Sequence, residues 1–523
     1  GGVAAGHPAT AEAGAEILRA GGNAFDAAIA ALLTACVAES TLTSLGGAGF
    51  LLAAPAQGKP VLFDFFSQTP QRRRSPDELD FYPVEVEFGD TTQEFHVGLG
   101  TVAVPGVPKG IAQIHRQLGR LPLAELAAPA IHWARSGVVV NPFQAYVIKI
   151  LSPILTATPG AQALYAPEGD LLKAGDRLRL SALANTLEHL VAVGFDSLYT
   201  GDLAQQFVAD CAAHGGQLTA QDLQAYQVMA RSPLAIAYRD RQVLTNPPPS
   251  SGGALIGFTL KLLATVDLAD IPLGSAAYVA HLAEVMALTN RARRDGYDTQ
   301  LYDPEVAARF LNSAHLQAYS EELAIALGAD FVANPGAPRL NKWGSTTHIS
   351  VIDGEGNAAS VTTSNGEGSS YVLPGTGVML NNMLGEEDLN PTGFHQWSEN
   401  PRISSMMAPS LLLKNGQPEV VLGSGGSNRI RTAIAQVITN FVDYDLDLAA
   451  AVAAPRLHWE RHHLHLEPGL ALPLANSSRA QDQLTQWQAP NMFFGGVHAV
   501  QVHADGQFSG AGDHRRNGAI AQA

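Results

Sequence analysis

The chain has 523 residues, of which 46% are hydrophobic and 15% are charged, and its formal net charge is −16. These values indicate a globular protein with a large buried core and exclude disordered and fibrous classes. The acidic balance argues against nucleic acid or an anionic membrane as the main partner. The two cysteines, Cys36 and Cys211, provide neither a disulfide framework nor a cysteine-rich zinc site. The most apolar stretch, residues 27–38, is too short to cross a bilayer, so we expect no membrane span.

Two helices are predicted near the N-terminus. Small and apolar residues from 9 to 38 follow a helical pattern that breaks at 21–23, and Asp26 opens a second, very apolar helix that we expect to be buried. The glycine-rich segment 44–50 then leads into a predicted buried strand. It lacks the G-x-G-x-x-G order and a following lysine, so we interpret it as close backbone packing rather than a phosphate-binding loop.

The middle of the chain is predicted to be mainly helical. The pattern from about residue 180 to 290 is typical of helices, and the run 247–253 begins another buried helix. No change of composition marks a linker and no internal repeat is present. We therefore expect one shared core.

A β-hairpin is predicted at residues 346–363. Polar residues alternate with Thr347, Ile349 and Val351, which indicates a strand with one apolar face. Turn residues follow at 353–357, and 358–363 has the small and β-branched residues of a return strand. On pattern alone this is an ordinary hairpin.

The sequence of this hairpin also resembles a known cleavage junction. The run 345–353, followed by Gly356-Asn357-Ala358, is similar to the self-cleavage site of the γ-glutamyltranspeptidase family, which belongs to the N-terminal-nucleophile hydrolases. Similar landmarks span the chain, at 21–28, 44–50, 104–110, 247–253, 423–429 and 513–516. The resemblance implies an α+β fold, a four-layer αββα sandwich with two stacked sheets. It also implies cleavage before Thr346 into a large subunit, 1–345, and a small subunit, 346–523, that share one core.

The resemblance assigns the chemistry to Thr346. A hydroxyl is a weak nucleophile at neutral pH and needs a base beside it. Cleavage before Thr346 would free an α-amine with an expected pKa of about 7.7–8.0, which can accept the proton of the hydroxyl. The implied activity is a self-processing γ-glutamyl transferase or hydrolase that acts on γ-glutamyl amides such as glutathione. Its acyl group would pass to water or to an amino acid or peptide amine, and no cofactor is required.

Further site residues follow from the same resemblance. The threonine that supports the nucleophile aligns with Thr363, although a short deletion leaves Ser364 as an alternative. The oxyanion loop is Gly425/Gly426 or Gly426/Ser427, because glycines allow backbone N–H groups to approach a developing charge. The remaining substrate-binding residues implied are Asn365, Glu386, Ser404, Ser405 and Ser427.

The sequence departs from the family at the substrate site. Phe66 stands where an arginine pairs with the donor carboxylate, and an aromatic ring cannot replace that bidentate contact. Met383 replaces a glutamine, and Arg72–Arg74 are interpreted mainly as a solvated turn. The connection between Glu386 and Ser404 is shorter than in members with a lid loop, so we expect an open site. These differences keep a glutaryl (cephalosporin-type) acylase as the alternative function, and an unprocessed, non-catalytic homologue as a third.

Other functional classes receive less support. His463 and His465 share one face of a predicted strand, beside His458 and His462, but no H-E-x-x-H motif is present. We therefore expect a solvated strand edge and no metal site. No G-x-S-x-G motif indicates a conventional serine hydrolase. The sequence leaves the cellular compartment unassigned.

Overall fold

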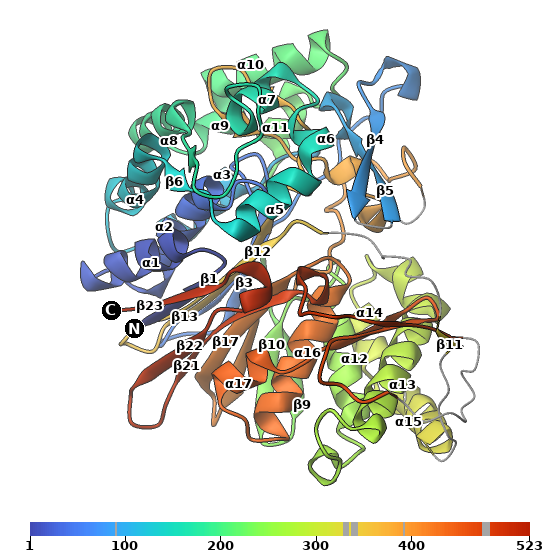
Figure 1. Ribbon diagram of the computed structural model, residues 1–523. Coiled ribbons are helices and arrows are strands. Elements are labelled where there is room, and N and C mark those ends of the chain that lie inside the picture. Colours follow the sequence, from blue (N-terminus) through green and yellow to red (C-terminus); the bar gives the residue numbers. More distant parts are fainter. Residues whose placement is uncertain (89–90, 328–333, 336–343, 391–392, 473–481) are drawn as a thin grey trace.

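Two antiparallel sheets lie against each other at the centre of the molecule (Figure 1). The computed structural model describes residues 1–88, 91–327, 334–335, 344–390, 393–472 and 482–523. The first sheet has the strand order β23 (Ala519–Gln522), β1 (Gly2–Ala5), β12 (Thr347–Ile352), β13 (Ala358–Ser364), β2 (Ala48–Ala54), β3 (Val61–Phe65) and β8 (Met229–Arg231). The second has the order β22 (Phe508–Ala511), β21 (Gly496–Val502), β17 (Gln417–Gly425), β16 (Ser410–Lys414), β10 (Arg241–Thr245) and β9 (Leu234–Tyr238).

Helices cover the outer side of both sheets, which confirms the predicted α+β fold with four αββα layers. The layer over the first sheet includes α1 (Pro8–Arg19), α2 (Ala24–Ala38), α4 (Leu123–Ser136) and α8 (Ser181–Val193). The layer over the second includes α12 (Gly252–Leu263), α16 (Arg429–Val442) and α17 (Leu448–Ala453), with α13 (Ala276–Ala292) and α15 (Ser313–Leu327) beside α12. Apolar burial between the layers is the main favourable contribution to such a fold.

Shorter elements complete the chain. The helices are α3 (Val107–Leu118), α5 (Pro142–Ile150), α6 (Ser152–Leu155), α7 (Pro159–Tyr165), α9 (Ser197–Thr200), α10 (Asp202–Ala213), α11 (Ala220–Ala225) and α14 (Val306–Phe310). The strands are β4 (Tyr82–Phe88), β5 (Thr91–Val97), β6 (Val138–Val139), β7 (Arg177–Leu178), β11 (Asn334–Pro335), β14 (Val372–Leu373), β15 (Val378–Met379), β18 (Leu457–Glu460), β19 (His463–Leu466) and β20 (Gln483–Gln486).

The two predicted N-terminal helices are confirmed. Asn23 caps α2, where its side chain accepts from the backbone N–H of Asp26, and Asp26 returns the contact to the backbone of Asn23. This reciprocal capping box satisfies N–H groups that have no partner within the helix. Every residue of α2 is buried, and the helix packs on β12 and β13.

The central hairpin is confirmed, but both of its faces are buried. On one face Ile349 and Val351 join the core formed with the N-terminal helices. On the other, the His348 ring bonds the hydroxyls of Thr362, at 2.8 Å, and Ser350, at 2.9 Å. Ser350 in turn donates to the His498 carbonyl of the second sheet, at 2.9 Å. The polar positions that alternate along this strand therefore connect the two sheets instead of facing solvent.

Residues 229–245 were predicted to be helical, and that prediction is wrong. They form β8, β9 and β10, and β10 pairs with β16 in the second sheet. The run 234–238 alternates buried and exposed residues with period two along β9. Pairing with a neighbouring strand decides the conformation of such short runs.

Segments from before and after residue 346 are interleaved within the first sheet. Strand β1 pairs with both β12 and β23, and β2 pairs with β13. The chain ends lie side by side (Figure 1), and the N-terminal amine of Gly1 donates to the Ala523 carbonyl at 3.0 Å. Residues from both sides of position 346 therefore form one sheet, while the shared core of two subunits and the boundary before Thr346 stay predictions.

A buried carboxyl joins the end of α2 to the hairpin. Glu39 accepts hydrogen bonds from the hydroxyls of Thr10, at 2.7 Å, and Thr347. Burial raises the pKa of Glu39 to about 7, against the partial compensation of these two bonds. The carboxyl is therefore a pH-dependent element next to the central strand.

The substitution Glu39→Gln tests this pH dependence. Because the folded pKa lies above the unfolded value of 4.5, the contribution of Glu39 is complete below pH 4.5 and is lost as the pH rises to about 7. We expect this loss to reach about 3 kcal/mol in the wild type and to be absent in the variant. Urea unfolding of both proteins from pH 4.5 to 8 measures the difference. A constant difference across that range would contradict the assignment.

Candidate active site

The Ser345–Thr346 bond lies in the wall of a pocket. The pocket has an empty volume of about 670 Å³, its open mouth included. Its lining combines residues from both sides of position 346 and mixes apolar side chains with acidic and hydroxyl groups. The lining residues used below are Phe66, Arg293, Asp298, Ser345, Thr346, Ser364, Met383, Glu386, Asp388, Ser404, Ser405 and Ser427.

The backbone on both sides of this bond is held by buried side chains. Ser364 donates its hydroxyl to the Ser345 carbonyl. Arg516 donates from Nη1 to the Thr346 carbonyl and from Nη2 to the Gly344 carbonyl, each at 3.2 Å. Gly425 packs so closely that an added Cβ would lie 2.1 Å from the Thr346 carbonyl oxygen. The carbonyls before and after the bond therefore have fixed positions.

The two hydroxyls considered for the supporting role lie in different places. Ser364 lines the pocket and contacts the junction. Thr363 donates to the Ala48 carbonyl at 3.1 Å and shares a hydrogen bond of 2.9 Å with the Thr43 hydroxyl. Thr363 thus binds a neighbouring strand and loop, and Ser364 is the residue in contact with the predicted cleavage site.

Glu367 was not identified from the sequence. The Ser345 backbone N–H donates to its Oε1 at 3.4 Å, and its own backbone N–H donates to the Asn382 side chain at 3.0 Å. Burial raises the pKa of Glu367 above its usual value, which favours a proton on this carboxyl. In the sequence, only the position of Glu367 three residues after Ser364 relates it to the site.

Four of the five predicted substrate-binding residues share the pocket wall. They are Glu386, Ser404, Ser405 and Ser427. The fifth, Asn365, is buried outside this lining, where its side chain donates to the carbonyls of Met379, at 3.4 Å, and Leu380, at 3.3 Å. The roles of all five stay predictions.

The glycine loop lies directly behind the junction. Gly425 contacts the Thr346 carbonyl, and Gly426 lies next to Gly495 and the Arg516 guanidinium. Neither glycine is part of the pocket lining, whereas Ser427 is. The Ser427 hydroxyl donates to Asp388 at 2.6 Å, which joins the loop to the acidic side of the pocket. The assignment of the oxyanion donors stays a prediction.

The departures from the family pattern also lie in this pocket. Phe66 lines it and stacks on Phe50, with ring centroids 5.2 Å apart, and Met383 lines it as well. The run Arg72–Arg74 does not belong to the lining: Arg73 donates to the His395 carbonyl and Arg74 to the Gly216 carbonyl. Among the described lining residues, Arg293 is the only basic side chain.

The segment between Glu386 and Ser404 contributes only its beginning to the pocket. Of its described residues, Asp388 and Leu389 are in the lining. Further along, Phe394 contacts the His96 ring, with centroids 4.4 Å apart, and the Pro401 carbonyl accepts from the backbone of Thr69. Whether a lid is absent stays a prediction.

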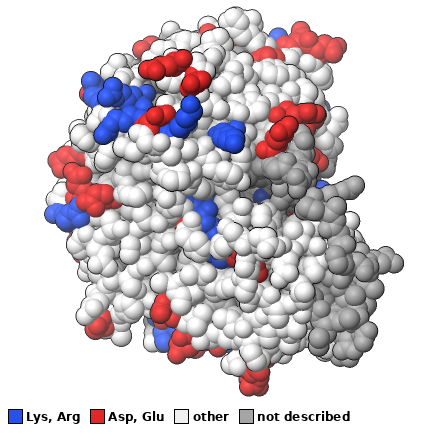
Figure 2. All heavy atoms as spheres, viewed as in Figure 1, with Lys and Arg blue, Asp and Glu red and all other residues white. Residues whose placement is uncertain are grey.

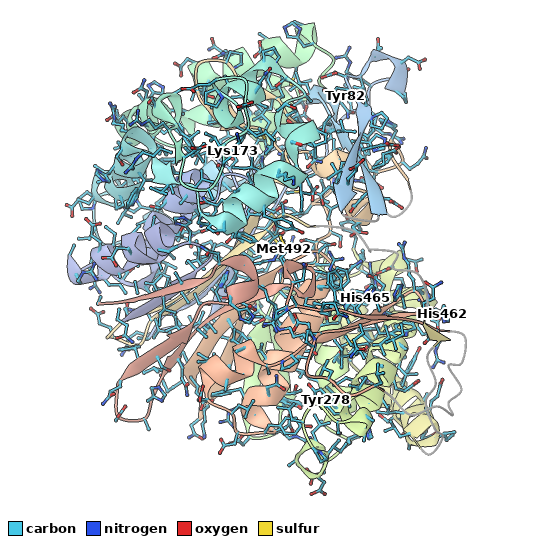
Figure 3. All side chains as sticks on the ribbon, viewed as in Figure 1. Tyr82, Lys173, Tyr278, His462, His465 and Met492 are labelled. Atoms are coloured by element: carbon cyan, nitrogen blue, oxygen red, sulfur yellow. The ribbon has the colours of Figure 1, made fainter. Side chains whose placement is uncertain are left out.

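The histidine-rich hairpin is buried, so the predicted solvated edge is wrong for three of the four residues. His458, His463 and His465 are at most 4% exposed, and the rings of His463 and His465 stack 4.0 Å apart. Figure 3 shows His462 at the outer end of the hairpin and His465 further in. Burial lowers the pKa of His465 well below its usual value, which favours a neutral ring. No group of three or more metal-ligating side chains occurs in the described part of the chain.

On the face shown in Figure 2, a group of Lys and Arg side chains at the upper left lies beside Asp and Glu side chains. Within the described ranges, no helix is long and apolar enough to cross a membrane.

Two stacked antiparallel sheets between layers of helices, shared with the solved structures described below, place the chain in the class of N-terminal-nucleophile hydrolases. The family model for gamma-glutamyltranspeptidase matches residues 10–523. The chain belongs to this family and is an enzyme of that type.

Curated relatives of two kinds match nearly the whole chain. It is 33% identical to the "Acylase ACY 1 proenzyme" of Pseudomonas sp. (strain V22), covering 99% of this chain and 92% of the relative. It is 31% identical to the "Glutathione hydrolase proenzyme" of Escherichia coli (strain K12), covering 98% and 90%. The two identities are too similar to separate the activities.

Solved structures include the same two kinds of protein. The cephalosporin acylase from Bacillus halodurans aligns with a TM-score of 0.84 at 26% identity, covering 100% of this chain and 95% of that one. The gamma-glutamyltranspeptidase of Helicobacter pylori aligns with a TM-score of 0.54 at 27% identity, covering 61% and 90%.

Several contributing residues were missed by the sequence analysis. Arg516 appeared only as part of a C-terminal landmark, without a role, and Arg293 and Asp388 were not singled out. All three lie far from Thr346 in sequence, so only the fold brings them to the junction or its pocket.

The variant Gly425→Ala tests the close packing behind Thr346. The new methyl would lie 2.1 Å from the Thr346 carbonyl oxygen, so the central strand must shift, at a cost of roughly 1–3 kcal/mol. Gly354→Ala is the matched control in the hairpin turn, where no described atom lies within 4 Å of the added methyl. Urea unfolding of both variants gives the comparison. Equal stabilities would contradict the packing.

Proposed function

We propose that the protein cleaves its own chain before Thr346 and then uses the Thr346 hydroxyl to transfer or hydrolyse γ-glutamyl groups. One observation carries the proposal: the carbonyls of Ser345 and Thr346 are held by Ser364 and Arg516 in the wall of a pocket. Intramolecular attack is fast only when the reacting groups are held in a suitable geometry. Relatives are named proenzymes, which supports processing of this chain too.

Self-cleavage would proceed through an ester. The Thr346 oxygen attacks the Ser345 carbonyl carbon, the C–N bond breaks, and the hydroxyl proton passes to the Thr346 nitrogen. Water then hydrolyses the ester, which leaves a carboxylate on Ser345 and a free amine on Thr346. The Ser364 hydroxyl already donates to the Ser345 carbonyl, so it can stabilise the developing oxyanion. Such a donor lowers the activation free energy by roughly 2.7–4 kcal/mol.

Acyl transfer would reuse the same oxygen. The freed α-amine, with a pKa near 7.7–8.0, takes the hydroxyl proton as the oxygen attacks the amide carbonyl of the donor. The amine product leaves with that proton, and a γ-glutamyl ester remains on Thr346 until water or an acceptor amine attacks it. The interleaved strands β1, β12, β2 and β13 would hold the two fragments together after cleavage.

The charges of the pocket support a γ-glutamyl donor. The described part of its wall carries three acidic side chains, Asp298, Glu386 and Asp388, and one basic side chain, Arg293. The γ-glutamyl group presents both an ammonium and a carboxylate, so it can pair with both kinds of charge. A glutaryl group lacks the ammonium and would add a further negative charge to this wall.

A glutaryl-type acylase is the second candidate. Phe66 and Met383 line the pocket and make part of it apolar, which suits a less polar acyl chain. The acylase relatives and the cephalosporin acylase structure support this candidate at the level of resemblance.

Self-cleavage is tested by variants at the junction. Thr346→Ala is expected to stay one chain, and Thr346→Ser to divide more slowly than the wild type. Ser364→Ala should slow division by roughly 10²–10³-fold, because the Ser345 carbonyl loses its donor. Thr363→Val is the matched control, because its hydroxyl contacts Ala48 and Thr43 instead. Denaturing gels over time give the rates, and division of Thr346→Ala would exclude Thr346 as the nucleophile.

The donor is tested by comparing γ-glutamyl-anilide with glutaryl-anilide on the processed protein. We expect kcat/KM to be at least ~10-fold higher for γ-glutamyl-anilide, since its ammonium pairs with the acidic wall. Release of the aniline, followed by absorbance, gives kcat and KM for each donor. Equal or faster turnover of glutaryl-anilide would support the second candidate in its place.

A further inference from the structure

The pocket beside the Ser345–Thr346 bond, called the acyl pocket below, has one basic side chain among its described lining residues. Its lining includes three carboxyl groups, and the apolar Phe66 and Met383 lie in the same wall. An acyl donor that carries a carboxylate needs a positive partner once its water is removed. Arg293 is the one described lining residue that can provide it.

Other arginines near the site are directed to other partners. Arg516 bonds the carbonyls of Thr346, Gly344 and Met492, and Arg402 donates to the carbonyls of Phe66 and Gln227. Neither belongs to the pocket lining. These two guanidiniums therefore bind backbone carbonyls, and Arg402 also pairs with Asp64. Among the described lining residues, only Arg293 brings a positive charge to the pocket.

The geometry of Arg293 leaves its terminal nitrogens available. The residue directly follows α13, and its Nε donates to both oxygens of Asp298, at 2.9 and 2.8 Å. Within the described residues this is the only hydrogen-bond partner of the guanidinium, and the side chain is 18% exposed. Asp298 thus fixes the orientation through Nε, and the Nη1/Nη2 pair remains for a second carboxylate. Two parallel N–H donors match the geometry of a carboxylate.

Arg293 also lies where the acyl pocket meets a second cavity. That cavity has an empty volume of about 960 Å³, open solvent included, and shares Arg293, Asp298 and Asp388 with the first. A donor carboxylate bound to Arg293 would therefore lie where the two cavities meet. Asp388, which lines both cavities, is an acidic group that could pair with the donor ammonium. The neighbouring Arg294 lines only the second cavity, which makes it a natural control.

We propose that Arg293, oriented by Asp298, binds the carboxylate of the acyl donor and selects donors that carry one. This inference rests on the proposed acyl transfer and identifies the residue that determines its specificity. Arg293, at the end of α13, would make the carboxylate contact that Phe66 cannot make.

The test compares wild type with Arg293→Ala, Arg293→Lys and Arg294→Ala. The donors are γ-glutamyl-anilide, which carries the carboxylate, and butyryl-anilide, which does not. For γ-glutamyl-anilide, Arg293→Ala should lower kcat/KM by roughly 30–100-fold, mainly through KM, with Arg293→Lys intermediate. Butyryl-anilide should change less than about threefold, as should both donors in Arg294→Ala. Division of the chain should proceed in all variants, which reports that each is folded.

Equal losses for both donors, or an unchanged KM in Arg293→Ala, would overturn the assignment. If the wild type itself cleaves neither anilide, the proposed function fails, and the Arg293 assignment is then decided by L-glutamate binding. In that case, L-glutamate should raise the melting temperature of the wild type and of Arg294→Ala. The absence of this rise in Arg293→Ala would support the carboxylate site. An equal shift in all proteins, or no shift in any, overturns it.

Discussion

The structure depends on how tightly the start of β12 is held. This strand is central in its sheet and buried on both faces, so the backbone around Thr346 cannot move independently. Ser364 and Arg516 bond the carbonyls on either side of the Ser345–Thr346 bond, and Gly425 packs against the second carbonyl without space for a methyl group. Close-packed interiors contain few voids and have low compressibility, so atoms held in this way have little room to shift. The proposed chemistry needs that constraint before cleavage and again afterwards.

The same constraint explains why residues far apart in sequence are required. The start of β12 is held by Arg516, near the end of the chain, and by the glycine loop at the end of β17. The pocket beside it is lined by Arg293, from the end of α13. Strands from before and after the junction are interleaved in the first sheet, so division of the chain would leave the core and the pocket wall intact. The proposed cleavage can therefore change the chemistry at Thr346 with little change in the fold.

The sequence predicted the fold through local patterns and a family resemblance. The capped helix at 24–38 and the hairpin at 347–364 follow from turn residues and periodicity, and both are present. Predictions from short runs were wrong where tertiary contacts decide the conformation or burial. Residues 229–245 form strands because β10 pairs with β16, and three of the four histidines at 458–465 are buried, His465 against the Phe493 ring. The Thr363/Ser364 alternative needed the structure, since adjacent residues of a strand point to opposite faces. Arg293 had no local signal, because its role follows from which residues share a pocket.

The most direct test of Thr346 as the nucleophile is an intact-mass measurement under denaturing conditions, after brief incubation with γ-glutamyl-anilide and an acid quench. We expect two polypeptides, 1–345 and 346–523, with one γ-glutamyl group on the second, and we expect peptide mapping to locate that group on Thr346. A single undivided chain, a division at another bond, or an acyl group on another residue would contradict this assignment.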